Sequence, residues 1–265
     1  MADHPFISFI VPVYNEELNI AHMLHNLHGV LAQYPQWNSE VIVVEDGSRD
    51  GTRQVICQEI KKYPQTQLIL HEENKGYTAS LKDGIQKSRG RYLMYIGADE
   101  EFDSTELPQF MDILIKDEAD VVLGVRWQRN AYTLFRFFLS MVYIFFLNYI
   151  FKLRVNDYNW SQIWSRKLFE RIELKSKSLF VLPEIIIKAY DLKLKVKEVP
   201  SNHRGRRAGK SSLNMKIMGL AVWEALSFWQ HRNSSRYQPD ETAHQPFLTP
   251  RASDSNPAVS HSSFQ

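Results

Sequence analysis

Short apolar runs alternate with amphipathic helical patterns through the first half of this 265-residue chain, and this alternation limits the possible folds more than any other feature. Residues 6–13 form a continuous apolar run, which is typical of a strand covered on both faces. Helical spacing of apolar residues follows over 19–33, and a second buried strand over 41–44. The pattern continues with predicted helices over 52–62, 78–87 and 107–116, and predicted strands over 68–70, 91–96 and 120–125. Strands separated by helices of this length predict parallel β-α-β units, so we expect a Rossmann-like α/β fold whose mostly parallel sheet is flanked by helices.

The charge balance and the cysteine content exclude several classes of protein. Lys and Arg total 32 against 30 for Asp and Glu, a net charge of +2, which gives no support to nucleic-acid binding. The basic segment 203–210 lacks interleaved aromatic residues, so we expect no nucleic-acid partner there either. A single cysteine, Cys57, excludes an intrachain disulfide and a multi-cysteine metal site. The first residues lack the basic start and cleavage site of a secretory signal, so we expect a cytoplasmic protein.

The second half of the chain contains two strongly apolar segments. Residues 137–151 carry no charge and would span about 22 Å as a helix, short of the ~30 Å hydrocarbon core of a bilayer. This run is either a buried core or dimer helix, or a helix in a membrane interface with basic flanks at Arg129, Arg136, Lys152 and Arg154. Residues 217–229, which include two tryptophans, suit an interface as well as a core. We therefore expect C-terminal amphipathic or interface helices.

Four polar clusters stand where predicted strands end, the edge at which parallel sheets bind ligands. The first two, 12–17 and 45–52, also suit simple turns and helix caps. The third, 74–80, contains Gly76, where the backbone has room to approach a ligand closely. The fourth, 97–101, contains acids that are well placed to hold a divalent cation through oxygen ligands.

The order and spacing of these clusters resemble the family 2 glycosyltransferases of the GT-A fold, most closely the branch that makes dolichyl- and polyprenyl-phosphate sugars. The resemblance covers residues 6–215 and includes three later elements, which are Gly124-Val125-Arg126, Glu198-Val199-Pro200 and Arg206-Arg207-Ala208-Gly209-Lys210-Ser211. It implies a GT-A domain over 1–232, with a nucleotide-sugar-binding half over 6–130 and an acceptor and membrane-interface half over 131–232. A Ser-, Pro-, His- and Asn-rich tail over 233–265 is predicted to be disordered.

The resemblance also implies roles for individual residues. The predicted donor-binding residues are Pro12, Val13, Tyr14, Asn15, Glu16, Glu45, Asp46, Gly76, Ala98 and Asp99. Asp99 and Glu101 are the predicted ligands of Mg²⁺ or Mn²⁺, and the predicted phosphate-binding residues are Arg126, Arg206, Lys210 and Ser211. A metal and arginines would stabilise the charge that develops on a nucleoside-diphosphate leaving group.

Two positions near the acids depart from the family pattern. The usual Asp-Ala-Asp begins here with Gly97, and Glu101 replaces the glutamine two residues after the second aspartate. Glu45 stands where an aspartate is common, which keeps the charge.

Asp157 is the candidate general base, needed only if the acceptor is a hydroxyl, because a phosphate acceptor is already mostly ionised near neutral pH. Alternatively, Asp157 caps a helix within a polar loop. We name Asp99, Asp157 and Arg206 as catalytic candidates.

The resemblance implies an inverting glycosyltransferase, peripherally associated with a membrane, that transfers a sugar from a nucleoside-diphosphate sugar to a lipid phosphate. The alternatives are the same fold acting on a glycan or small hydroxyl acceptor, and a sugar-nucleotide-binding protein without transfer activity. A second copy of the chain or a membrane subunit is left open as a further partner.

Overall fold

One mixed sheet of seven strands organises the chain. The computed structural model describes residues 5–128, 134–206, 215–234, 237–239 and 247–248. The strands are β1 (Ile7–Val13), β2 (Ser39–Glu45), β3 (Thr66–Leu70), β4 (Tyr92–Tyr95), β5 (Val121–Gln128), β6 (Gln162–Ser165) and β7 (Val196–Asn202). Their order is β3-β2-β1-β4-β6-β5-β7, and β6 alone runs antiparallel to its neighbours β4 and β5. The expected mostly parallel α/β sheet is thus confirmed.

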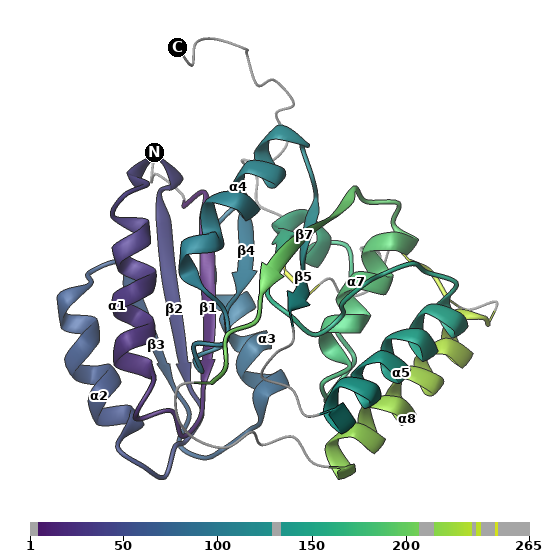
Figure 1. Ribbon diagram of the computed structural model, residues 1–265, viewed down its shortest axis with the longest axis horizontal. Coiled ribbons are helices and arrows are strands. Elements are labelled where there is room, and N and C mark those ends of the chain that lie inside the picture. Colours follow the sequence, from purple (N-terminus) through teal and green to yellow (C-terminus); the bar gives the residue numbers. More distant parts are fainter. Residues whose placement is uncertain (1–4, 129–133, 207–214, 235–236, 240–246, 249–265) are drawn as a thin grey trace.

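Helices cover both faces of this sheet (Figure 1). They are α1 (Ile20–Leu31), α2 (Thr52–Glu59), α3 (Tyr77–Lys87), α4 (Leu107–Lys116), α5 (Leu134–Phe151), α6 (Arg166–Phe169), α7 (Val181–Asp191) and α8 (Met215–Arg232), with short 3₁₀ turns η1 (Pro35–Trp37), η2 (Ile60–Lys62) and η3 (Ser104–Glu106).

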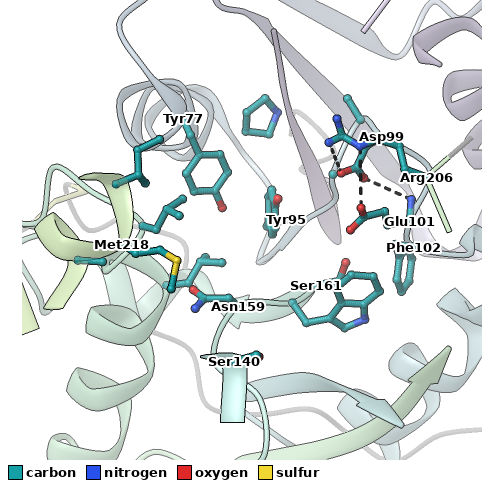
Figure 2. A pocket seen from close by; sticks show the side chains of 18 of the residues that line it. Tyr77, Tyr95, Asp99, Glu101, Phe102, Ser140, Asn159, Ser161, Arg206 and Met218 are labelled. Carbon is teal, nitrogen blue, oxygen red and sulfur yellow. Dashed lines mark hydrogen bonds and ion pairs between the residues drawn. The ribbon is translucent and has the colours of Figure 1, made fainter. Parts of the chain in front are cut away.

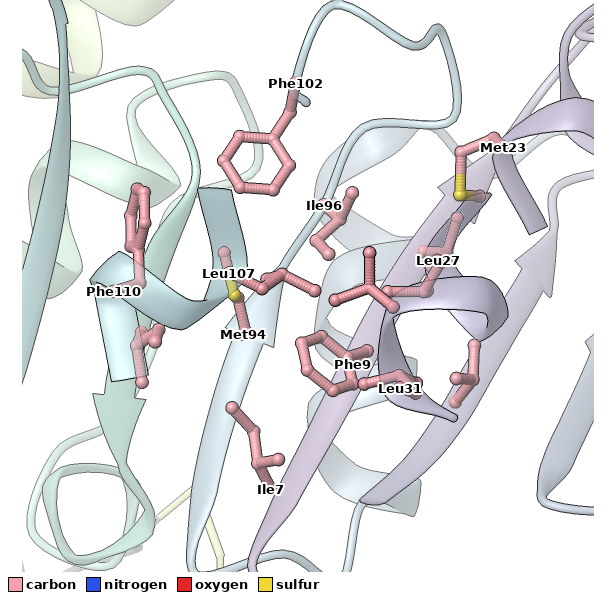
Figure 3. Close-up of a cluster of buried hydrophobic side chains, with 14 of the residues drawn as sticks. Ile7, Phe9, Met23, Leu27, Leu31, Met94, Ile96, Phe102, Leu107 and Phe110 are labelled. Carbon is pink, nitrogen blue, oxygen red and sulfur yellow. The ribbon is translucent and has the colours of Figure 1, made fainter. Parts of the chain in front are cut away.

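Alternate residues of the central strands supply two separate cores. In β1, Phe9 and Val11 point toward α1 and α4, whereas Ile10 between them packs with α3 on the other face. Figure 3 shows the first core, where Phe9 and Ile7 lie among Leu27, Leu31 and Met94. Because β1 and β2 are buried on both faces, their sequences are continuous apolar runs, as the first half of the chain indicated.

The short strand β6 and the helices α6 and α7 were not predicted from the sequence. Nearly every residue of α7 is buried, including Glu184 and Lys188, whose Oε1 and Nζ atoms pair at 3.4 Å. The longest apolar run of α7, 185–187, is too short to distinguish a buried helix from a buried strand by pattern alone.

Helices α5 and α8 lie side by side at one end of the molecule, away from the centre of the sheet (Figure 1). Ile144, Leu147 and Phe151 on α5 pack into the second core, but much of the remaining α5 surface is exposed. By length and composition, α5 is the one helix within the described residues that is long and apolar enough to cross a bilayer, and 17% of it is buried. Of the expected basic flanks, Lys152 and Arg154 are exposed at its C-terminal end, whereas Arg129 lies outside the described residues.

Most of the tail over 233–265 also lies outside the described residues. Where the tail is described, it packs on the fold. The Tyr237 hydroxyl donates to Asp191 Oδ2 at 2.6 Å, and the Leu248 backbone N–H donates to the Phe169 carbonyl at 2.9 Å.

Candidate active site

A cavity of about 600 Å³ opens at the carboxyl ends of β1, β4 and β5 and extends to α5 and α8 (Figure 2). The sheet side contributes polar residues: Tyr14, Glu16, Asp46, Tyr95, Asp99, Glu101, Arg126 and Arg206. The helical side contributes mainly apolar ones: Phe135, Leu139, Leu179, Leu182, Ile217, Met218, Ala221 and Val222. One continuous space therefore joins a charged end to an apolar end.

Three carboxylates converge on one guanidinium at the charged end. The Arg206 Nη2 atom lies 2.8 Å from Asp99 Oδ2 and 3.4 Å from Glu16 Oε1, and Arg206 Nε lies 3.9 Å from Glu101 Oε1. In Figure 2 the side chains of Asp99, Glu101 and Arg206 lie close together, with dashed lines marking the interactions. Residues 99 and 101 follow β4 and residue 206 follows β7, so the sheet brings together groups that are 107 positions apart in the chain.

The pKa shifts in this cluster reflect both burial and pairing. Burial raises the pKa of Glu16 above its ordinary value, despite opposing contributions from Asn19 and Arg206. Burial alone would also raise the pKa of Glu101, but the hydrogen bond and charge of His203, with the charges of Arg206 and Arg136, lower it. Glu101 is therefore held as a carboxylate, the form that binds cations.

His203 is a member of the site that the sequence did not reveal. Its Nε2 atom lies 3.3 Å from Glu101 Oε2, and a single β-bridge pairs His203 with Phe102. Its ring also packs edge-on against Trp160, with the ring centroids 5.4 Å apart. A contact between residues 101 and 203 leaves no spacing signal in the sequence.

The acids fit a divalent cation that completes its shell with ligands from a substrate. Within the described residues, no three His, Cys, Asp or Glu side chains are arranged as a ready-made metal site. Asp99 and Glu101 nevertheless supply hard oxygen ligands on one wall of the cavity, and Mg²⁺ is commonly held by one or two carboxylates plus phosphates and water. A Cβ atom at Gly97 would come within 2.9 Å of Asp99 Oδ1, so glycine leaves room for this carboxylate.

Asp46 is fixed in the cavity wall by a relay that includes an unpredicted histidine. Asp46 accepts hydrogen bonds from the backbone N–H groups of Lys75 at 2.9 Å and Gly76 at 2.8 Å. His71, which is buried, places Nδ1 2.7 Å from Asp46 Oδ1 and Nε2 2.9 Å from Asp83 Oδ2. Gly76 has φ = +90°, which glycine adopts without strain. It does not line the cavity itself, and its backbone N–H group helps to hold Asp46 in place.

Replacing His71 by leucine is expected to lower the free energy of unfolding by about 1.5–3 kcal/mol, because the buried Asp46 carboxylate loses a charge-assisted hydrogen bond. Denaturant unfolding measures this change. A matched control is His28→Leu, since His28 is also buried but contacts neutral partners, Thr66 and Gln65, and burial lowers its pKa to about 4. Equal losses of stability in the two variants would contradict the relay.

Asp157 does not have the geometry of a general base. It is 1% exposed and does not line the cavity. Both of its oxygens are engaged by Arg126, whose Nε and Nη2 atoms donate to Oδ2 and Oδ1, each at 2.7 Å. Arg126 also lies over the Trp160 ring, 5.0 Å from its centroid. The sequence-based role of base is therefore corrected: Asp157 holds Arg126 in place, and Arg126 is the group that reaches the cavity.

Several predicted donor-binding residues lie outside the cavity lining. The exposed Asn15 accepts from the backbone N–H of Arg49 at 2.8 Å, so it supports a turn. Glu45 is fully buried, and its pKa is lowered by hydrogen bonds from Ser48 and by Arg53, which together outweigh the effect of burial. Both residues build the loop rather than the cavity wall. Pro12, Val13, Tyr14, Glu16, Asp46, Ala98 and Asp99 do line the cavity, as do Glu101, Arg126 and Arg206. The predicted phosphate-binding residues Lys210 and Ser211 lie outside the described residues.

A mostly parallel sheet with acids and arginines at its carboxyl edge defines an α/β fold suited to a nucleoside diphosphate. Solved structures of glucosyl-3-phosphoglycerate synthase from Mycobacterium tuberculosis share this fold. One in complex with Mg²⁺ and UDP has a TM-score of 0.66, 15% identity, and covers 88% of this chain and 82% of its own. Another, with Mn²⁺, UDP and phosphoglyceric acid, has a TM-score of 0.66 and 16% identity, with coverage of 88% and 81%.

The chain belongs to glycosyl transferase family 2, since the model of that family matches residues 8–173. Among its relatives is dodecaprenyl-phosphate galacturonate synthase of Rhizobium johnstonii, 24% identical over 228 residues, which are 83% of this chain and 65% of the relative. A dolichyl-phosphate beta-glucosyltransferase of Dictyostelium discoideum is 31% identical over 133 residues, or 47% of this chain and 41% of the relative. The chain thus spans less than two thirds of the length of these two relatives.

Proposed function

We propose that this chain is an inverting glycosyltransferase that moves a sugar from a nucleoside-diphosphate sugar to a polyprenyl-phosphate-type lipid at a membrane surface. The observation that carries the proposal is the continuity of the cavity from the acid and arginine end to the apolar end between α5 and α8. A soluble hydroxyl acceptor has no need of an apolar end. The names of the relatives, which include a dodecaprenyl-phosphate and a dolichyl-phosphate enzyme, support the same substrate class.

The charged end is assigned to the diphosphate of the donor. Asp99 and Glu101 would hold a divalent cation there, which supplies Lewis-acid stabilisation of the leaving diphosphate. Arg206, now paired with Asp99, would turn to the phosphate oxygens when the cation neutralises the carboxylates. Tyr14 and Asp46 line the wall on the β1 and β2 side, where we place the nucleoside.

The lipid phosphate is assigned to the region where Arg126, Arg136 and Ser140 line the cavity. Arg136 and Ser140 are one helical turn apart on α5, so they lie on the same helix face as Tyr143. A phosphate monoester is largely ionised at neutral pH and attacks without a protein base, which agrees with the burial of Asp157. The prenyl chain would then extend along Leu139, Met218 and Val222 toward the membrane.

Incubating the protein with labelled nucleotide sugars, Mn²⁺ and vesicles containing a polyprenyl phosphate tests the proposal. The expected result is label in the organic-solvent extract. Label in a water-soluble saccharide instead would favour the hydroxyl-acceptor alternative. Donor binding without turnover would favour a sugar-nucleotide-binding protein. Either of these results would overturn the proposed acceptor.

Membrane association is proposed from the outward face of α5 and α8. Phe138 is 63% exposed, Phe145 72% and Trp223 64%, and these side chains come from two helices that lie together. Exposed apolar groups of this size on paired helices suit the boundary between headgroups and acyl chains. Lys152 and Arg154 are exposed at the end of α5 and would add a salt-dependent attraction to anionic lipid.

Replacing Phe138, Phe145 and Trp223 together by serine is expected to weaken binding to anionic vesicles by at least tenfold, since each large apolar side chain contributes roughly 1.5–3 kcal/mol when fully buried. Flotation measures the bound fraction. Ile144 is left intact because it is only 6% exposed and belongs to the core.

The control for this flotation experiment replaces Leu18, Leu70 and Ile115 by serine, because these exposed apolar residues lie outside α5 and α8. It should leave vesicle binding unchanged. If the α5 and α8 variant floats as well as the wild type, or only changes from dimer to monomer, this face is not a membrane contact.

A further inference from the structure

Phenol groups line the cavity between its charged end and its apolar end. Tyr95 ends β4, and a Cβ atom at Gly97 would lie 3.7 Å from its hydroxyl oxygen and 2.9 Å from Asp99 Oδ1. The Tyr95 hydroxyl therefore adjoins the acid cluster. Tyr77 packs edge-on against Tyr95, with 5.5 Å between the ring centroids. The two rings thus lead from the proposed diphosphate site into the middle of the cavity.

Two buried hydroxyls face this middle section: that of Tyr143 has no hydrogen-bond partner among the described residues, and that of Tyr77 interacts with the hydroxyl of Tyr95. Tyr77 lies at the start of α3 and Tyr143 on α5, so the two hydroxyls come from separate walls of the same cavity. In Figure 2 the Tyr77 hydroxyl points into the cavity, on the side of Asn159 and Met218. A buried hydroxyl without a partner is costly, so the Tyr143 hydroxyl is expected to find a partner on a ligand. A phenol both donates and accepts, so Tyr77 keeps bonding capacity for a ligand beside its contact with Tyr95.

The chemistry of these groups suits neutral hydroxyls. Burial, with the neighbouring phenol of Tyr95, raises the pKa of Tyr77 well above its ordinary value, so its hydroxyl stays protonated. A protonated phenol both donates and accepts, as does the side-chain amide of Asn159 through its two ends. Sugar hydroxyls have the same dual character.

The position of these groups identifies which part of the substrates they meet. In the proposed reaction, the anomeric carbon lies between the diphosphate that leaves and the lipid phosphate that attacks. We infer that Tyr77, Tyr143 and Asn159 form the subsite for the hydroxyl groups of the transferred sugar. This inference rests on the proposed function.

The test compares binding of nucleotide sugars with binding of the nucleoside diphosphates alone. Calorimetry with Mn²⁺ would use UDP-glucose, UDP-galacturonic acid and GDP-mannose, with UDP and GDP as the sugar-free ligands. Tyr77→Phe and Tyr143→Phe each remove one hydroxyl and keep the ring. Each variant is expected to lower the affinity for the nucleotide sugar by roughly three- to tenfold and to leave the affinity for the nucleoside diphosphate unchanged. Tyr92→Phe, on the same strand as Tyr95 but outside the cavity lining, is the control and should change neither.

Unchanged affinity for the sugar nucleotide in both variants would overturn the inference, as would equal losses for the diphosphate. A loss confined to the Michaelis constant of the polyprenyl phosphate would also overturn it, because the phenols would then contact the acceptor. Failure of the wild type to bind any of the five nucleotides is a different result, which would overturn the proposed function and this inference with it.

Discussion

Replacing Asp99 by asparagine is expected to lower sugar transfer by roughly 100- to 1,000-fold, the effect of losing several kcal/mol of metal-assisted stabilisation of the leaving group. Asparagine keeps the size of the side chain but removes the charge that faces Arg206 and a bound cation. Mn²⁺-dependent donor binding, measured by calorimetry, should disappear, while the thermal unfolding of the ligand-free protein should change little.

Glu100→Gln is the matched control for Asp99→Asn. Glu100 lies between the two proposed metal ligands in the chain, but its Oε1 accepts from Asn26 Nδ2 at 3.1 Å and contacts His22, both on α1. It does not line the cavity, so this variant should retain transfer activity. If Asp99→Asn retains Mn²⁺-dependent donor affinity, Asp99 is not a metal ligand.

Replacing Asp157 by alanine is expected to lower the free energy of unfolding by about 3–5 kcal/mol. The variant leaves the Arg126 guanidinium buried without the carboxylate that it contacts through two hydrogen bonds. It also removes the acceptor of the Asn159 backbone N–H, at 3.2 Å. Chemical denaturation measures the loss. A change below about 1 kcal/mol, the size of a typical exposed ion pair, would contradict this assignment.

A double variant separates stability from function at this ion pair. Arg126→Leu with Asp157→Leu leaves no uncompensated buried charge, so it should unfold at a higher denaturant concentration than Asp157→Ala. The double variant should nevertheless lose transfer activity, because Arg126 is the member of the pair that lines the cavity. Active double variants would show that Arg126 does not bind the acceptor phosphate.

The secondary structure could be predicted where the local hydrophobic pattern of a segment matches the number of its faces that are buried. Strands β1 and β2 are covered on both faces, so each is one apolar run, and α1 buries only one side, so it keeps a helical period. The antiparallel β6 has four residues, and its place between β4 and β5 depends on long-range pairing. Neither its direction nor its neighbours can be deduced from so short a segment.

The candidate site also contains some residues that the sequence indicated and others that it did not. Tyr14 and Asp46 follow strands directly, and Asp99 comes four residues after the end of β4, so the strand pattern indicated that they share one edge. His71 and His203 act through partners that are 25 and 102 positions away, respectively, and no local pattern marks them. Conversely, Glu45 keeps the charge that the motif has at its position, yet its side chain turns to Arg53 within the loop, which only the three-dimensional structure reveals.

The central claim is that a single cavity holds a donor diphosphate at one end and a lipid phosphate near the other. The most direct measurement is sugar transfer in vesicles that contain either a polyprenyl phosphate or the corresponding polyprenol, with the same donor and Mn²⁺. The account predicts a glycosylated lipid phosphate, identified by its mass, and no product from the alcohol. Equal transfer to the polyprenol, or transfer only to a water-soluble acceptor, would contradict it.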